Sequence, residues 1–252
     1  MAPPSNPYFP THRKIPGARF QLICLPYAGG GSLVYKSWET KLAPGIEVAA
    51  VELPGRGRRF GEKAHQRLDT LLPPLVQAIG SVLDGRPFAI FGHSMGALLA
   101  FEVAHRLHRA GAKLPSVLFL SARGTRERDE AIHTLPEDRF IARLRSYSGT
   151  PTEILDHPEM MELFLPLLRA DFAIATGSGD QETTGALPVP LEVMGGTSDP
   201  HVPVEDLSGW AVRTTSQFRS TVFTGGHFYQ REQEDAVLRL ITSRLESEAP
   251  AA

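Results

Sequence analysis

The chain has 252 residues, of which 42% are hydrophobic and 21% charged, and its formal net charge is −2. This length suits one α/β domain with a sizeable core, and the charge excludes the strongly basic surface expected for binding nucleic acid or anionic membranes. No apolar run approaches the roughly 18 residues that a membrane span needs. Because the N-terminus lacks a signal-peptide core and there is a single cysteine, we expect a cytoplasmic protein.

The first half of the chain alternates between apolar strand patterns and amphipathic helix patterns. The predicted elements are strands at 20–25, 46–52, 88–91 and 117–120, and helices at 32–42, 67–83 and 94–110. Pro73 and Pro74 fall inside the second helix, and we expect them to bend or restart it. Cys24 lies in the apolar run "FQLICLP" and is expected to be a buried small side chain rather than a reactive thiol. The alternation is typical of a parallel sheet with helices on both faces.

The alternation stops between about residues 124 and 186, where helical patterns occupy 136–145 and 158–175 and Pro166 interrupts the second. Strands in "VPLEVMGG" and "STVFTGG" and a helix at 230–245 then complete the pattern. We predict a single α/β domain at 19–246 with this insertion as a helical lid above the strand ends. The alternative is that the inserted helices only thicken the core. The segments 1–18 and 247–252 are expected to be flexible.

A serine between two glycines stands where the third strand meets its helix. The motif "GHSMG" has glycines two residues before and after Ser94, which leaves room for a strained strand-to-helix turn. Such a turn lifts the hydroxyl above the sheet and places it at a helix N-terminus, where free N–H groups stabilise developing negative charge. We predict that Ser94 is a nucleophile, and the alternative is a glycine-flanked helix cap.

A nucleophilic serine needs a histidine as base, and a carboxylate orients that histidine. Where the serine lies on a strand-to-helix turn, the chain order is serine, acid, histidine. His227, between the strand "STVFTGG" and a helix, is the predicted base, with His201 as its rival. Asp199, just past the strand end in "LEVMGGTSDP", is the predicted acid. The other acids considered include Asp129, Asp138, Asp156, Asp171, Asp180 and Asp206.

A second glycine-rich turn, "CLPYAGGGS", also lies between a strand and a helix. It lacks the phosphate-binding patterns, because no G-K-[S/T] follows and position 34 is valine. We predict that this turn supplies one oxyanion-hole donor, the Ala28 N–H, and that the Met95 N–H supplies the other. The alternative is a flexible linker. No metal site is expected, since there is no H-E-x-x-H motif and one cysteine, and His105 and His108 are expected at the surface.

Six blocks of the chain resemble the type II, or editing, thioesterases of polyketide and nonribosomal peptide assembly lines. They are "LPYAGGGS", "ELPGRGRR", "FGHSMGALLAFEVAHRL", "LPLLRADF", "GGTSDPHV" and "GGHFY". The resemblance covers roughly 20–245 and implies an α/β-hydrolase fold, with a mostly parallel central sheet flanked by helices and a helical lid. It implies Ser94 as nucleophile with Asp199 and His227, and Ala28 and Met95 as oxyanion donors.

The resemblance also implies a reaction and partners. The enzyme would hydrolyse acyl thioesters from the phosphopantetheine arm of acyl or peptidyl carrier proteins and so remove aberrant or short acyl groups. No cofactor is needed, because the substrate carries the phosphopantetheine. We expect a monomer that binds neither nucleic acid nor membrane. The alternatives are a medium-chain thioesterase that terminates fatty acid synthesis, a general carboxylesterase, and a non-catalytic binding protein of the same fold.

Two groups of side chains are predicted to contact the substrate. Those expected to line or cover the acyl pocket are Tyr27, Phe164, Leu168, Asp171, Phe172 and Phe228. Because one methylene is worth only about 1–3 kcal/mol in such a pocket, we expect broad and modest acyl selectivity. The basic loop with Arg56, Arg58 and Arg59 is predicted to meet an acidic carrier protein or its phosphate, and the alternative is a solvated turn.

Overall fold

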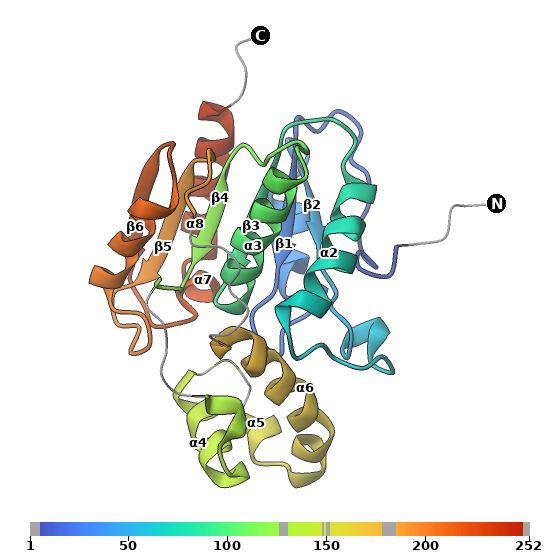
Figure 1. The fold of residues 1–252 in the computed structure, drawn as a ribbon, viewed down its shortest axis with the longest axis vertical. Helices are drawn as coiled ribbons and strands as arrows, with labels where there is room; N and C mark the ends of the chain where they lie inside the picture. Colours follow the sequence, from blue (N-terminus) through green and yellow to red (C-terminus); the bar gives the residue numbers. More distant parts are fainter. Residues whose placement is uncertain (1–5, 126–130, 148, 150–151, 178–184, 249–252) are drawn as a thin grey trace, which may run out of the picture.

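A six-stranded sheet forms the centre of the computed structural model, which describes residues 6–125, 131–147, 149, 152–177 and 185–248 (Figure 1). The strand order is β2-β1-β3-β4-β5-β6, and every neighbouring pair is parallel. The strands are β1 (Phe20–Leu25), β2 (Ile46–Ala50), β3 (Phe88–His93), β4 (Leu118–Ser121), β5 (Leu191–Gly196) and β6 (Phe218–Phe223). The predicted α/β fold class is confirmed.

Helices cover both faces of this sheet (Figure 1). On one face lie α2 (Leu68–Val82) and α3 (Met95–Arg109), and on the other α1 (Lys36–Lys41) and α8 (Glu234–Ser247). Along β1, Ile23 packs into the first of the two cores, and Leu22 and Cys24 pack into the second. Both faces of the strand are therefore apolar, which explains its continuous hydrophobic run. Cys24 is fully buried, as predicted, and burial raises the pKa of its thiol.

The inserted helices form a layer of their own beyond the carboxyl ends of the strands, at the bottom of Figure 1. They are α4 (Glu137–Tyr147), α5 (Thr152–Leu155) and α6 (Pro158–Thr176), preceded by the short 3₁₀-helix η3 (Ile132–Thr134). Their apolar side chains make a separate core that includes Phe140, Leu144 and Met161. The insertion therefore covers the strand ends rather than thickening the sheet's core.

Several element predictions differ from the structure. The helix α2 continues past Pro73 and Pro74 without restarting, and α6 continues past Pro166. Leu71, Leu72 and Leu75 bury the apolar face of α2, so tertiary packing offsets the cost of the prolines. The terminal helix is divided into α7 (Tyr229–Glu232) and α8. The helix predicted at 32–42 is likewise divided, into the 3₁₀-helix η1 (Ser32–Tyr35) and α1. The short helix α5 and two other 3₁₀-helices, η2 (Gly57–Arg59) and η4 (Val204–Arg213), were not predicted.

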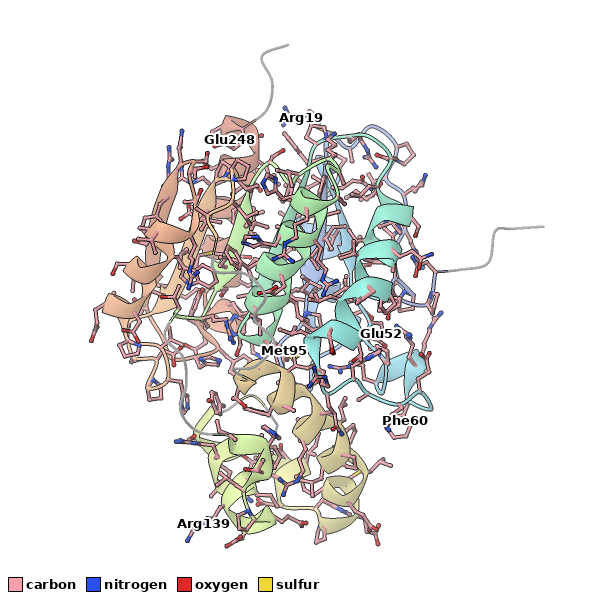
Figure 2. All side chains as sticks on the ribbon, in the orientation of Figure 1. Arg19, Glu52, Phe60, Met95, Arg139 and Glu248 are labelled. Atoms are coloured by element: carbon pink, nitrogen blue, oxygen red, sulfur yellow. The ribbon has the colours of Figure 1, made fainter. Side chains whose placement is uncertain are left out.

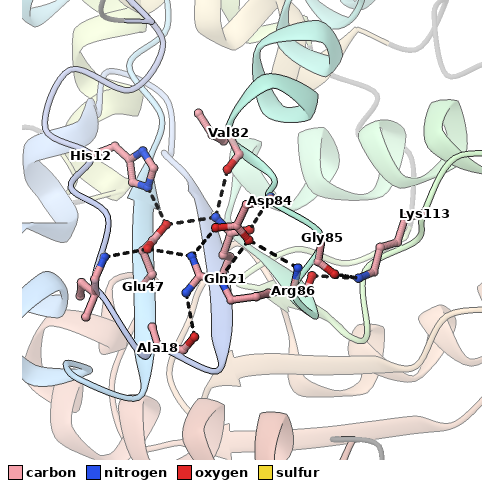
Figure 3. Close-up of polar contacts among 10 residues, drawn as sticks. His12, Ala18, Gln21, Glu47, Val82, Asp84, Gly85, Arg86 and Lys113 are labelled. Carbon is pink, nitrogen blue, oxygen red and sulfur yellow. Dashed lines mark hydrogen bonds and ion pairs between the residues drawn. The ribbon is translucent and has the colours of Figure 1, made fainter. Parts of the chain in front are cut away.

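The N-terminal segment is packed against the domain, contrary to the prediction that 1–18 is flexible. Tyr8 and Phe9 are buried in the main core, and the Tyr8 carbonyl accepts a hydrogen bond from the Glu52 N–H at 2.8 Å. Figure 3 shows His12 reaching the carboxylate of Glu47 at the amino end of β2. Residues 6–18 are therefore part of the domain. Residues 1–5 and 249–252 lie outside the described part of the chain.

Candidate active site

The turn from β3 into α3 holds Ser94 in a strained conformation. Its φ is +55° and its ψ is −111°, a combination that non-glycine residues rarely adopt. A Cβ atom on Gly92 would lie 2.0 Å from the Gly96 carbonyl oxygen, and one on Gly96 would lie 2.2 Å from the Leu25 carbonyl oxygen. Only glycine fits at these two positions, which is the physical reason for the spacing in "GHSMG".

Ser94, His227 and Asp199 form a continuous hydrogen-bonded chain. Ser94 Oγ lies 3.1 Å from His227 Nε2, and His227 Nδ1 lies 2.7 Å from Asp199 Oδ2. With the ring proton on Nδ1, His227 donates to the carboxylate and accepts from the serine hydroxyl. Burial raises the pKa of Asp199, but hydrogen bonds from His227 and from the N–H groups of His201 and Val202 outweigh it and hold that pKa below its ordinary value. Asp199 therefore stays ionised beside the imidazole.

Three strand ends bring these residues together. Ser94 directly follows β3, Asp199 lies three residues after β5, and His227 lies four residues after β6. The carboxyl ends of parallel strands share one edge of the sheet, which is where ligands bind in such folds. Figure 2 shows the neighbouring Met95 at the end of the sheet that faces α6, while Arg19 and Glu248 lie at the opposite end.

The other histidines occupy different settings. The ring of His201, the rival base, stacks on Tyr147 with 3.7 Å between centroids, and its Nε2 lies 3.1 Å from the Ser146 carbonyl oxygen. His105 is buried against Phe101, so the prediction that it lies at the surface is wrong, and burial lowers its pKa to about 4. His93, which the sequence did not single out, is fully buried beside His227, and burial lowers its pKa well below the ordinary value.

The two predicted oxyanion donors both lie near Ser94, one along the chain and one across the pocket. Met95 is the next residue in the chain, and Ala28 lines the same pocket as Ser94 and His227. Within the described residues, neither the Ala28 N–H nor the Met95 N–H donates a hydrogen bond to another group of the protein. Both groups are therefore available to a substrate oxygen.

Two adjoining pockets open at this site. The pocket beside Ser94 has a volume of about 20 Å³, enough for about one water molecule, and the second has about 340 Å³. Of the predicted substrate contacts, Phe172 and Phe228 line the first and Phe164 the second, while Tyr27 and Leu168 line both. Further lining residues that the sequence did not single out as substrate contacts are Val34, Leu144, Tyr147, Gly149, Ile154, Leu167 and Arg231. Arg231 lies only four residues after His227, and this closeness in the chain is the signal that indicates a residue of the pocket.

Asp171 and two of the three loop arginines differ from their predicted roles. Asp171 lines neither pocket; it is buried and forms an ion pair with Arg56, with 2.7 Å between Nη2 and Oδ1. Arg59 is also buried, where its guanidinium lies over the Tyr8 ring and pairs with Glu62. Neither arginine presents its charged group to a carrier protein. Arg58 alone of the three is exposed.

A hydrogen-bonded serine, histidine and aspartate at the carboxyl ends of a parallel sheet, beneath a helical layer, define a serine hydrolase of the α/β-hydrolase class. The Thioesterase domain model matches residues 20–245, and the chain belongs to that family. Among the described residues, no cluster of three or more His, Cys, Asp or Glu side chains forms a metal site. None of the described helices is long and apolar enough to cross a membrane.

Similar proteins support this assignment. The chain is 36% identical over 236 residues to "Linear gramicidin dehydrogenase LgrE" of Brevibacillus parabrevis, covering 91% of this chain and 89% of the relative. Its fold matches the type II thioesterase BorB from the borrelidin biosynthetic cluster with a TM-score of 0.82 and 36% identity, over 91% of this chain and 94% of the other. It matches ClbQ from the colibactin NRPS/PKS pathway with a TM-score of 0.85 and 28% identity, over 92% and 98%.

Proposed function

We propose that this protein is a type II thioesterase, which hydrolyses short or aberrant acyl groups from the phosphopantetheine arm of carrier proteins in polyketide or nonribosomal peptide synthesis. The observation that carries the proposal is the Ser94–His227–Asp199 chain facing a pocket, in a member of the Thioesterase domain family. The carrier protein domain is the partner, and the substrate brings its own phosphopantetheine, so no cofactor is needed. We also propose a cytoplasmic monomer.

The first half of the reaction transfers the acyl group to the protein. Ser94 Oγ attacks the thioester carbonyl carbon while its proton passes to His227 Nε2. Asp199 holds the ring in the required tautomer and stabilises the imidazolium that forms. The N–H groups of Ala28 and Met95 donate to the oxyanion, each such donor being typically worth about 2.7–4 kcal/mol of barrier. The carbon–sulfur bond then breaks, and the pantetheine thiol leaves with the proton from His227.

The second half releases the acid. A water molecule gives a proton to His227 Nε2 and attacks the acyl carbon of the Ser94 ester. The tetrahedral intermediate again places its oxyanion on the two N–H groups. When the ester bond breaks, His227 returns the proton to Ser94 Oγ, so the carboxylic acid leaves and the serine is restored.

The size of the pocket beside Ser94 supports short acyl groups as substrates. Its volume of about 20 Å³ leaves space for only a small group unless the lining side chains move. Leu168 and Tyr27 line both pockets and so stand between this narrow space and the larger one. A short acyl group would fill the narrow pocket, while a long one would need the larger volume.

The test is release of acyl groups from a loaded carrier protein by wild type and by Ser94→Ala. Acetyl, propionyl, malonyl and longer acyl groups are compared, and a thiol assay follows the freed pantetheine. We expect serine-dependent release that is fastest for short groups, with turnover by Ser94→Ala at background. Release of only long chains would indicate product termination instead. Cleavage of p-nitrophenyl esters without any thioester release would indicate a general esterase.

A further inference from the structure

The glycine-rich turn that carries Ala28 is held by charged side chains from distant parts of the chain. Asp171 of α6, with 1% of its surface exposed, accepts a hydrogen bond from the Gly29 N–H at 2.7 Å. Arg56 donates to both carboxylate oxygens of Asp171 at 2.7 Å and to the Gly30 carbonyl oxygen at 2.9 Å. These contacts fix the backbone on both sides of the peptide bond between Gly29 and Gly30.

A third charged group holds the far end of the same turn. Glu52, which follows β2 and is buried, accepts a hydrogen bond from the Ser32 N–H at 2.6 Å. Its other carboxylate oxygen accepts from the Arg58 N–H at 3.1 Å. The segment from Gly29 to Ser32 is therefore held by the loop after β2, through Glu52 and Arg56, and by the lid helix α6, through Asp171.

This segment needs such tethers because it contains three consecutive glycines. Glycine loses more conformational freedom on ordering than any other residue, and it has no side chain to hold the backbone. Gly29 has a φ of +80°, and a Cβ atom there would lie 2.7 Å from a methyl group of Leu168 on α6. The lid helix thus contacts the turn through both a polar and an apolar side chain.

We propose that Asp171, together with Arg56, is a positioning residue that orients the Ala28 N–H towards the oxyanion. Catalysis then depends on the position of α6 against the glycine-rich turn. The inference rests on the proposed function for its substrate but not for its geometry. Asp171 lines neither pocket and does not touch the acyl group. It acts by fixing the Gly29 peptide, which sets the orientation of the preceding residue.

The alternative is that the ion pair only stabilises the fold, and the chain offers a matched control for this. Glu192 is equally buried, with 1% exposed, and accepts a hydrogen bond from Arg244 Nε at 2.6 Å. It lies near the amino end of β5, whereas Ser94 lies at the carboxyl end of β3. Asp171→Asn and Glu192→Gln therefore remove the same kind of charge from two buried carboxylates, each paired with an arginine, of which one contacts the turn.

The experiment measures kcat, KM and melting temperature for both variants, and the affinity for butylboronic acid. This probe forms a tetrahedral adduct with the serine, one of whose oxygens takes the oxyanion position. We expect Asp171→Asn to lower kcat on a short acyl thioester by about 10- to 100-fold with KM changed by less than about threefold, and to weaken boronic acid binding by a similar factor. Glu192→Gln should lower the melting temperature and leave kcat and boronic acid affinity unchanged.

Other outcomes separate this inference from the proposed function. If Asp171→Asn keeps the wild-type kcat and boronic acid affinity while its melting temperature falls like that of Glu192→Gln, the pair is only structural and the inference is overturned. If wild type releases no acyl group, the proposed function fails, but boronic acid affinity still tests the positioning role. Arg56→Lys, which keeps the charge and loses the paired geometry, serves if Asp171→Asn does not fold, and should lower both quantities in the same direction.

Discussion

The two ends of the central sheet both bury charged side chains, but they use them differently. At the amino ends, Glu47 is fully buried, and each of its carboxylate oxygens accepts two hydrogen bonds (Figure 3). The donors are His12, the Ile15 N–H, Gln21 and Arg86. At the carboxyl ends, Ser94 is strained, and within the described residues the N–H groups of Ala28 and Met95 lack partners. At the amino end the buried polar groups satisfy one another, whereas at the carboxyl end two backbone donors have no partner among the described residues.

This difference separates stability from reactivity within one sheet. A satisfied buried carboxylate fixes the chain around it, and losing it costs folding free energy. Backbone strain and unpaired donors lower the free energy of unfolding when the site is empty. Unpaired donors can in turn stabilise negative charge that develops on a bound substrate. Substitutions at the amino end should therefore change stability alone, and those at the carboxyl end should change activity far more than stability.

After Ser94→Ala, the largest expected effect is that of Asp199→Asn on turnover. The amide cannot hold His227 in the tautomer that accepts the serine proton, so we expect kcat to fall by about 10⁴-fold. The melting temperature should change by only a few degrees. The exposed Asp235→Asn is the matched control and should leave kcat unchanged. A kcat within tenfold of wild type would contradict the assignment of the acid.

The second effect is on stability, at the other end of the sheet. Glu47→Gln removes a charge that Arg86 and three other donors contact, and we expect a loss of about 3 kcal/mol in the free energy of unfolding with kcat unchanged. Urea unfolding measures this loss. Glu246→Gln, at an exposed pair with Arg19, should cost less than about 1 kcal/mol. Loss of kcat in the folded Glu47 variant would break the comparison.

The stability difference between wild type and Glu47→Gln should also depend on pH. Burial raises the pKa of Glu47, but hydrogen bonds from Arg86, Ile15, His12 and Gln21 outweigh it and lower the pKa from 4.5 to about 2. The unfolded chain therefore binds a proton more readily than the folded one, and wild type loses this stabilisation as the pH falls from about 4.5 towards 2. Urea unfolding at pH 7 and pH 3 should show a smaller difference at pH 3.

The third effect concerns acyl selectivity. Leu168→Ala removes a side chain that stands between the two pockets, so longer acyl groups gain access to the larger volume. We expect the ratio of kcat/KM for hexanoyl over acetyl thioesters to rise about tenfold. Leu163→Ala is the control, since this exposed residue of the same helix lines neither pocket. An unchanged ratio would mean that the narrow pocket does not limit chain length.

The smallest effect is expected at the exposed Arg58. Arg58→Glu should raise KM for acyl groups on a carrier protein by only a few-fold, because a single exposed charge contributes little to binding. KM for the same acyl group on coenzyme A should not change. Arg139→Glu, at the far end of the lid (Figure 2), is the matched charge reversal and should change neither KM. Equal effects of the two reversals would remove Arg58 as a specific contact.

The sequence predicts most of the sheet and brings Ser94, Asp199 and His227 into consideration because each follows a strand whose pattern is regular. The residues that follow a strand lie just beyond its carboxyl end, so three parallel strands bring three side chains to the same end of the sheet.

The contacts of the lid cannot be predicted in this way. Arg56 and Asp171 are 115 residues apart, and nothing in the local pattern "ELPGRGRR" indicates that Arg56 turns inwards to that carboxylate.

The prolines and the N-terminal segment show the same limit. Pro73, Pro74 and Pro166 lie inside continuous helices whose stability comes from apolar contacts with other elements. Tyr8 and Phe9 look like part of a polar, proline-rich extension until the sheet supplies a surface for them. Local propensity describes the conformation that a segment prefers in isolation. The conformation of these segments is set instead by their contacts with other elements.

The strand order has a consequence for how activity is lost. The serine follows β3, every residue of which is buried within the sheet, whereas the histidine follows β6, an edge strand with half of its residues exposed. Edge strands fray before central ones, so local opening of β6 would detach the base while the nucleophile keeps its place. Hydrogen exchange should be fastest along β6, and in mild denaturant hydrolysis should cease at concentrations where circular dichroism still reports a native fold.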